Sequence, residues 1–351
     1  QSSTLGGPLL QCSIHGAEDL RIEDVPCPQP GPDQALVKMG AAGICGSDMH
    51  YFRHGQIGKF KIQEPLIPGH EASGVIAALG ANVTGLDEGQ RVAINPSHPC
   101  GECSRCREGR ENLCDSMFFL GSASVFPHAQ GMFREYFLIS AKQCIPVSKQ
   151  VSLEELALSE PLSVGLHAVN RAGNLCGKRV LISGSGTIGC MVLLAAKLDG
   201  AEQVTMVDVL EEPLAIARKV GADQTLCVKP SAAPSPELIN EFDVAFEVSG
   251  AASALGNCIE LVRRGGTIVQ VGTLPVEGIH LFANQIMVKE LDIRGSMRFG
   301  NVFSRAVRLL ENQRLNVKPI LTGRFPIAEA AKALQLAFDK TVSMKVQIVA
   351  D

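Results

Sequence analysis

Two patterns of hydrophobic and polar positions divide the chain. Up to about Ser148, short β-branched segments alternate with turns rich in Gly, Pro, Asn and Asp, which is typical of strands joined by loops. The strands expected here are Ala35–Met39, Gly74–Leu79 and Gln90–Ile94. The first part of the chain is therefore predicted to be mainly β.

The pattern changes near Val151, where Ser152 and Glu155 form a capping box before apolar residues at helical spacing. From there continuous apolar strands alternate with helices, which predicts a parallel sheet buried on both faces. The expected strands are 179–183, 203–207, 242–246, 266–271 and 291–294, and the expected helices are 188–197 and 213–220. Two amphipathic helices, 302–310 and 327–338, and a closing strand, 344–349, complete the pattern.

A chain of 351 residues is longer than one hydrophobic core usually serves, so two domains are expected. The closing strand is expected to return to the first domain and make it discontinuous. The predicted bounds are 1–155 with 298–351 for the first domain and 156–297 for the second.

Composition narrows the possible partners and the compartment. The chain is 46% hydrophobic and 19% charged with a formal net charge of −4, so nucleic acid and anionic membranes are not expected partners. No apolar run approaches the roughly 18 residues of a membrane helix, and the N-terminal residues do not resemble a secretory signal. Twelve scattered cysteines in a chain with an ordinary core favour a reducing, cytoplasmic setting. Seven are predicted to be small buried hydrophobes: Cys12, Cys27, Cys144, Cys176, Cys190, Cys227 and Cys258.

One group of residues predicts a catalytic metal. His70 and Glu71 follow Gly69, and Cys45 lies upstream in a glycine-flanked turn. Thiolate, imidazole and carboxylate form a zinc ligand set, and three protein ligands leave a position for water or substrate. Glu160 is an alternative to Glu71 as the third ligand, and the spacing leaves both open.

A glycine-rich segment predicts a dinucleotide site. Gly184, Gly186 and Gly189 stand between an expected strand and an expected helix, and Asp208 ends the next strand. Such a loop lets the backbone and the helix N-terminus bind a pyrophosphate, while the acidic residue accepts hydrogen bonds from the ribose. Residues 209–212 contain no lysine or arginine for a 2′-phosphate, so NAD is favoured over NADP. The candidate cofactor-binding residues are Gly184, Gly186, Thr187, Ile188, Gly189 and Asp208.

Four further cysteines predict a structural metal. Cys100, Cys103, Cys106 and Cys114 are separated by gaps of two, two and seven residues, which suits a closed tetrahedral zinc site. An iron–sulfur cluster is the chemical alternative, and zinc is favoured in a β-rich domain. Because all four positions are filled, this metal is not expected to contact substrate.

Together these motifs resemble the zinc-containing medium-chain alcohol and polyol dehydrogenases over essentially the whole chain. The resemblance rests on residues 69–71 followed by Gly74, Gly80 and Val83, and on Cys45, the cysteine quartet and the glycine loop. It implies an α/β protein with a GroES-like β-rich catalytic domain and a Rossmann coenzyme domain with a doubly wound parallel sheet. Zinc and nicotinamide would occupy a cleft between them, and a homo-oligomer, a dimer or a tetramer, is implied.

The resemblance also assigns roles. Glu71 would ligate zinc directly, as in polyol enzymes, with Glu160 holding the metal-bound water or substrate. Ser47 would pass a proton by way of the cofactor ribose towards His50. For Ser47 and His50 the sequence also allows a structural interpretation: Ser47 could be a turn residue, and His50 could lie in a surface loop.

Shorter stretches indicate the substrate class. Residues 43–51 resemble the sorbitol dehydrogenase branch, whereas 94–97, 118–123, 126–128, 246–250 and 294–299 resemble the bacterial L-idonate 5-dehydrogenase branch. The predicted reaction is oxidation of L-idonate to 5-keto-D-gluconate. Arg298 is the candidate for gripping the carboxylate, unless it pairs with a surface acid, and Tyr51 and His128 are further substrate candidates. A neutral-polyol dehydrogenase and a noncatalytic zinc- and nucleotide-binding homologue are the alternatives.

Overall fold

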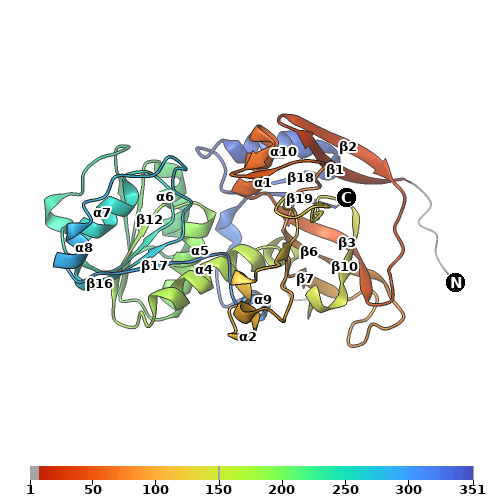
Figure 1. Ribbon diagram of the computed structural model, residues 1–351, viewed down its shortest axis with the longest axis horizontal. Helices are drawn as coiled ribbons and strands as arrows, with labels where there is room; N and C mark the ends of the chain where they lie inside the picture. Colours follow the sequence, from red (N-terminus) through yellow and green to blue (C-terminus); the bar gives the residue numbers. More distant parts are fainter. Residues whose placement is uncertain (1–7, 149–150, 351) are drawn as a thin grey trace. The chain divides into compact units, whose positions relative to one another are not determined.

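The computed structural model describes residues 8–148 and 151–350, and the chain forms two compact units (Figure 1). Unit 1 comprises Gln1–Glu160, Phe303–Asp339 and Lys345–Asp351, and unit 2 comprises Pro161–Val302 and Lys340–Met344. The final strand thus belongs to the same unit as the N-terminal strands.

Unit 1 is built around a seven-stranded sheet with the order β11-β7-β6-β3-β19-β18, in which β10 also pairs with β3. In Figure 1 the blue strands β18 and β19 lie side by side, and β19 pairs with β3 in antiparallel register, with Gln347 opposite Gly43. Large buried side chains such as Phe133 and Phe137 fill its core. The strands are β3 (Gln34–Gly43), β6 (Glu71–Leu79), β7 (Arg91–Ile94), β10 (Tyr136–Ser140), β11 (Cys144–Val147), β18 (Leu321–Pro326) and β19 (Lys345–Val349).

Short strand pairs and helices surround this sheet. The strand pairs are β1 (Leu9–Gly16) with β2 (Asp19–Val25), β4 (Gln56–Ile57) with β5 (Phe60–Lys61), and β8 (Ser97–His98) with β9 (Phe118–Phe119). The helices are α1 (Gly46–His54), α2 (Ser104–Arg107), α3 (Leu153–Leu156), α9 (Phe303–Glu311) and α10 (Ala330–Phe338).

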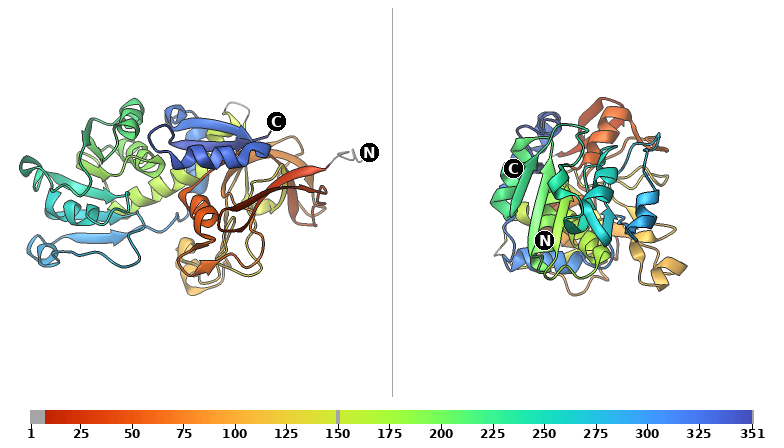
Figure 2. Two further views of the ribbon diagram at one scale, coloured as in Figure 1. Left: turned by 90° about the horizontal axis from the view of Figure 1, so that it is seen from above. Right: turned by 90° about the vertical axis from the view of Figure 1, so that its left-hand side faces the viewer.

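Unit 2 contains a six-stranded sheet with the order β14-β13-β12-β15-β16-β17. Every neighbouring pair is parallel, and Figures 1 and 2 show helices flanking the strands. This order is the doubly wound one that places a ligand site where the strand order reverses, beside β12. The strands are β12 (Arg179–Ser183), β13 (Gln203–Asp208), β14 (Gln224–Cys227), β15 (Phe242–Glu247), β16 (Val262–Gln270) and β17 (Asp292–Gly295). The helices are α4 (Ser159–Ala172), which starts at the end of unit 1, α5 (Thr187–Leu198), α6 (Glu211–Val220), α7 (Ala254–Leu261) and α8 (Asn284–Val288).

The structure corrects some local predictions. The segment after Cys45 is helix α1 and not a turn or a loop, because the Asp48 carboxylate accepts the Cys45 N–H and caps it. The helix expected over 327–338 begins with a 3₁₀ turn, Ile327–Glu329, before α10. Within the described residues, no helix is both long and apolar enough to cross a membrane.

The cysteine prediction was partly wrong. Cys12, Cys144, Cys190 and Cys258 are buried as predicted, but Cys27 is half-buried and Cys176 and Cys227 are exposed. The exposed pair lies on a loop before β12 and at the end of the edge strand β14, where no layer covers them. All twelve cysteines are free thiols.

Candidate catalytic and cofactor sites

The first candidate ligand, Cys45, is the N-cap residue of α1. Asp48 holds Cys45 close to the segment that carries His70, because its Oδ2 accepts the Cys45 N–H at 2.8 Å and its Oδ1 accepts the Gly69 N–H at 3.0 Å. A fully buried carboxylate therefore ties the two ligand-bearing segments together.

Glu71 is the first residue of β6, and His70 directly precedes it. The His70 ring packs against Phe119 with ring centroids 5.4 Å apart, and its Nδ1 lies 3.9 Å from Oδ1 of Asp48. One potential ligand atom from each of Cys45, His70 and Glu71 lies within 4.8 Å of the other two. The structure thus brings together the three residues that the sequence singled out.

Electrostatics favour a cation at this point. Burial lowers the pKa of His70, but the charges of Cys45, Asp48 and Glu160 outweigh burial and raise that pKa to about 10. Glu160, in the first turn of α4, is also buried, but it is not part of the group of three. An imidazole surrounded by anions is a place where a positive charge is stabilised.

The donor set fits zinc. Oε1 of Glu71 is buried and has no hydrogen-bond partner within the described residues, a costly arrangement that a metal ion relieves. Sulfur, nitrogen and oxygen donors from Cys45, His70 and Glu71 suit Zn²⁺ and leave one tetrahedral position for a reactant.

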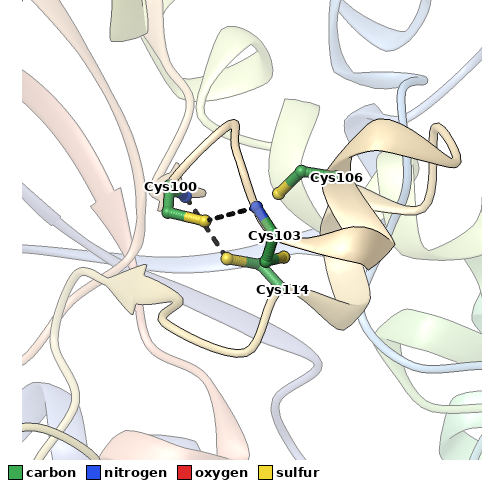
Figure 3. A group of neighbouring side chains, drawn as sticks. All are labelled: Cys100, Cys103, Cys106 and Cys114. Carbon is green, nitrogen blue, oxygen red and sulfur yellow. Dashed lines mark hydrogen bonds between the residues drawn. The ribbon is translucent and has the colours of Figure 1, made fainter.

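The cysteine quartet forms the second metal group. The ligand atoms of Cys100, Cys103, Cys106 and Cys114 all lie within 4.8 Å of one another, and Figure 3 shows the four side chains gathered together, with Cys106 on helix α2. The Cys103 N–H donates to Sγ of Cys100 and the Cys100 N–H donates to Sγ of Cys114, both at 3.3 Å. Backbone N–H groups of Asp115 and Cys106 lower the pKa of Cys103 to about 6. These two N–H groups stabilise the thiolate form of Cys103, the form that binds metal.

The glycine loop of unit 2 connects β12 to α5. Gly186 is the N-cap residue of α5, and a Cβ there would meet no atom within 4 Å, so the helix N-terminus is open for a phosphate. A Cβ on Gly189 would lie 2.0 Å from the Gly184 carbonyl oxygen. The backbone packs too closely here for any side chain, so the third position of the loop requires glycine. Thr187 and Ile188 form the first turn of α5.

Asp208 lies at the carboxyl end of β13 beside this loop. Its Oδ2 accepts the Ser185 N–H at 2.7 Å, and its Oδ1 accepts the N–H groups of Val209 and Leu210 at 2.7 and 3.0 Å. These bonds fix the carboxylate, and each oxygen keeps capacity for a hydroxyl donor. This arrangement fits the adenosine ribose of a dinucleotide.

The remaining candidates have diverse environments. Ser47 is half-buried and His50 exposed, both on α1. Tyr51 is buried, and its hydroxyl accepts the Ala123 N–H at 3.0 Å. His128 is also buried, and its two ring nitrogens bond to the backbone, Nε2 to Gln63 N and Nδ1 to Val125 O. Both contacts anchor loops of unit 1.

Arg298 belongs to unit 2, in the segment after β17. It is half-buried and has a left-handed backbone with φ of 49°, which is uncommon outside glycine. Such backbone conformations cluster at functional sites.

Two residues important to the metal group were missed by the sequence. Asp48 links Cys45 to Gly69, and Lys345 donates from Nζ to Oε2 of Glu71 at 2.7 Å. The signal for Asp48 was available, because an acidic residue three positions after an N-cap often caps a helix. Lys345 gave no local signal, because its partner is 274 positions away.

Comparisons with known proteins agree with this geometry. Residues 31–149 match the family described as Alcohol dehydrogenase GroES-like domain, and residues 187–312 match Zinc-binding dehydrogenase. An L-idonate 5-dehydrogenase (NAD(P)(+)) of Escherichia coli strain K12 is 41% identical over 318 residues, covering 90% of this chain and 91% of that protein. A sorbitol dehydrogenase of Gallus gallus is 40% identical over 335 residues, covering 94% and 93%.

The chain belongs to the zinc-dependent medium-chain polyol dehydrogenases. The crystal structure of L-idonate 5-dehydrogenase from Escherichia coli K-12 aligns with a TM-score of 0.90 at 38% identity, covering 97% of this chain and 98% of that one. The predictions of a GroES-like domain with a Rossmann domain and of an oxidoreductase are confirmed. The prediction of zinc and NAD as cofactors is confirmed at the level of the family, whose cofactors are zinc and NAD(P).

Proposed function

We propose that this dehydrogenase transfers a hydride between NAD(H) and a secondary alcohol or ketone of a sugar acid, with L-idonate and 5-keto-D-gluconate as the reacting pair. The observation that carries the proposal is the Cys45, His70 and Glu71 group in a chain 41% identical to an L-idonate 5-dehydrogenase. When bound, zinc supplies a Lewis acid at the reacting oxygen and the nicotinamide accepts the hydride.

Cys45, His70 and Glu71 are proposed to hold the catalytic zinc, and Glu160 to orient the reactant through its buried carboxylate. Ser47, half-buried two residues after Cys45, is proposed to take the alcohol proton and His50 to deliver it to solvent. The exposure of His50 supports that direction, since a proton must leave the site. The quartet is proposed to hold a structural zinc, because four thiols close its coordination.

Arg298 is proposed to bind the substrate carboxylate, because a guanidinium can form two parallel bonds to it. Its left-handed backbone supports a functional role. Tyr51 and His128 stay as proposed substrate residues, and their backbone contacts suggest that they would act by shaping loops.

NAD is proposed as the preferred cofactor. Glu211 and Glu212 lie in the first turn of α6, just after Asp208, and would repel a 2′-phosphate. A reducing, cytoplasmic location is proposed because all twelve cysteines are free thiols.

A homo-oligomer, a dimer or a tetramer, is proposed because β17 ends the unit 2 sheet with an edge available for pairing. Large apolar side chains in the segment between β16 and α8 are exposed, with Val276 at 93% and Phe282 at 74%. Light scattering on the purified protein tests this directly, and a monomeric mass contradicts it.

The substrate is tested by a spectrophotometric panel of L-idonate, D-gluconate, sorbitol, xylitol and threonine with NAD and NADP. We expect the highest kcat/KM for L-idonate with NAD. A preference for sorbitol would support a neutral-polyol dehydrogenase, which the 40% identity to a sorbitol dehydrogenase makes the second candidate. Tight binding of zinc and NADH without turnover on any alcohol would instead indicate a noncatalytic homologue.

Arg298→Ala separates the substrate classes. Loss of a charge-assisted hydrogen bond should lower kcat/KM for aldonates roughly 10- to 100-fold while sparing neutral polyols. Equal losses on both classes would contradict the carboxylate role of Arg298.

A further inference from the structure

A buried lysine lies directly behind the proposed zinc ligand. Lys345 is the first residue of β19 and is only 3% exposed. Its Nζ donates to Oε2 of Glu71 at 2.7 Å and to the Ile44 carbonyl oxygen at 2.9 Å. A buried ammonium is costly unless it is paired and hydrogen-bonded, so these two bonds hold Lys345 in place.

The pair leaves the two oxygens of Glu71 in different states. Oε2 is held by Lys345, whereas Oε1 is buried without a hydrogen-bond partner within the described residues. A carboxylate anchored through one oxygen cannot rotate freely, so the other oxygen keeps a fixed position. Glu71 also contributes to the group that contains Cys45 and His70.

The sheet is built to accommodate this pair. Strand β3 lies between β6, which carries Glu71, and β19, which carries Lys345. Gly43 of β3 is in register with Glu71, and a Cβ there would lie 2.3 Å from Oε2 of Glu71 and 3.2 Å from Cδ of Lys345. The ion pair therefore crosses over β3 at Gly43, where the side chain is only a hydrogen atom.

We propose that Lys345 is a positioning residue for the catalytic zinc: by holding Oε2 of Glu71 it presents Oε1 as the single metal-binding oxygen. The inference rests on the proposed role of Glu71 as a ligand. It extends that role by naming the residue that determines how the carboxylate binds.

Two roles for Lys345 make opposite predictions about zinc affinity. A positive charge near the metal opposes zinc binding, so a purely electrostatic role predicts tighter binding when the charge is removed. A positioning role predicts weaker binding, since loss of a hydrogen-bond partner behind a ligand typically costs 10- to 100-fold in metal affinity or activity.

The test is a double-mutant cycle read by zinc affinity, which we would measure by chelator competition with metal counting. Lys345→Met should weaken the catalytic site 10- to 100-fold and leave the quartet zinc bound as an internal reference. Glu71→Gln should weaken the same site, and adding Lys345→Met in that background should have little further effect, because Lys345 acts through Glu71. Lys345→Arg should recover part of the affinity.

Two controls separate positioning from general loss of stability. Lys289→Met removes another buried lysine, in unit 2, whose Nζ donates to the carbonyl oxygens of Ile259 and Glu260, and it should leave zinc affinity unchanged. The visible spectrum of the cobalt-substituted protein should change in Lys345→Met, because Glu71 is no longer restricted to one oxygen.

Unchanged or tighter zinc binding in folded Lys345→Met, or additive effects in the cycle, would overturn the proposal. The proposed reaction fails separately, when wild-type protein with both zinc ions shows no NAD-linked turnover. The binding cycle is interpretable in either case, because it needs no substrate.

Discussion

Gly43→Ala tests whether β3, the strand between Glu71 and Lys345, must have a glycine at position 43. The added Cβ would lie 2.3 Å from Oε2 of Glu71. An ordinary carbon–oxygen contact needs about 3.3 Å, so the carboxylate must move by about 1 Å. The 2.7 Å bond to Lys345 cannot survive such a shift without the lysine following, and the Cβ also meets Cδ of Lys345 at 3.2 Å.

The expected cost has two parts. Overpacking of a tight site typically lowers the free energy of unfolding by about 1–3 kcal/mol. For a unit of about 200 residues this corresponds to a fall in Tm of roughly 2–12 °C. Zinc–ligand distances in proteins stay within about 0.2 Å of their standard values, so the Glu71 shift should also weaken binding of the catalytic zinc.

The assays are thermal unfolding of the metal-free protein and the zinc content of the purified protein. Gly16→Ala is the matched control, since Gly16 also lies on a strand of unit 1 and a Cβ there meets nothing within 4 Å. The reasoning is refuted if Gly43→Ala keeps a full complement of zinc and unfolds at the same temperature as Gly16→Ala.

Three further predictions concern the other sites. Cys106→Ser should lower the zinc content by about one per chain and expose the quartet loop to limited proteolysis, with NADH affinity unchanged; retention of both metals would argue against a structural site. Gly189→Ala should weaken NADH binding at least tenfold in a fluorescence titration, because its Cβ would lie 2.0 Å from the Gly184 carbonyl oxygen; wild-type affinity would contradict the packing argument. Asp208→Ala should shift the ratio of kcat/KM for NAD to that for NADP towards NADP by roughly tenfold or more, and an unchanged ratio would exclude the proposed ribose contact.

The residues that the sequence identified best are those whose chemistry is local. The glycine loop could be recognised because its three glycines, the preceding strand and Asp208 lie within 30 residues of one another. The fold of unit 2 followed from apolar strands alternating with helices, and the six parallel strands agree with it. Strand and helix ends moved by a few residues, because hydrogen bonds and caps determine them more than propensity does.

The features that the sequence did not reveal depend on contacts between distant segments. Lys345 and Gln347 alternate with apolar residues in the closing strand, a pattern that suggests one solvent-facing side. In the structure every residue of β19 is buried. Lys345 bonds to Glu71, and the Gln347 side chain donates to the Glu154 carbonyl oxygen. An alternating pattern therefore does not show whether the polar side chains form hydrogen bonds with water or with buried protein groups.

The pairing of Lys345 with Glu71 gives a chemical role to the return of the C-terminal strand to unit 1. Along the chain, residues 161–302 lie between the segments that carry the proposed zinc ligands and the strand that carries Lys345. Until β19 joins β3, Glu71 lacks the ammonium that neutralises its buried carboxylate, and both of its oxygens need another partner. Folding of the C-terminal strand onto the sheet thus completes the environment of the zinc ligand as well as the hydrophobic core. This explains why a strand so far along the chain carries a buried charge, where an apolar side chain of similar volume would pack at a lower desolvation cost.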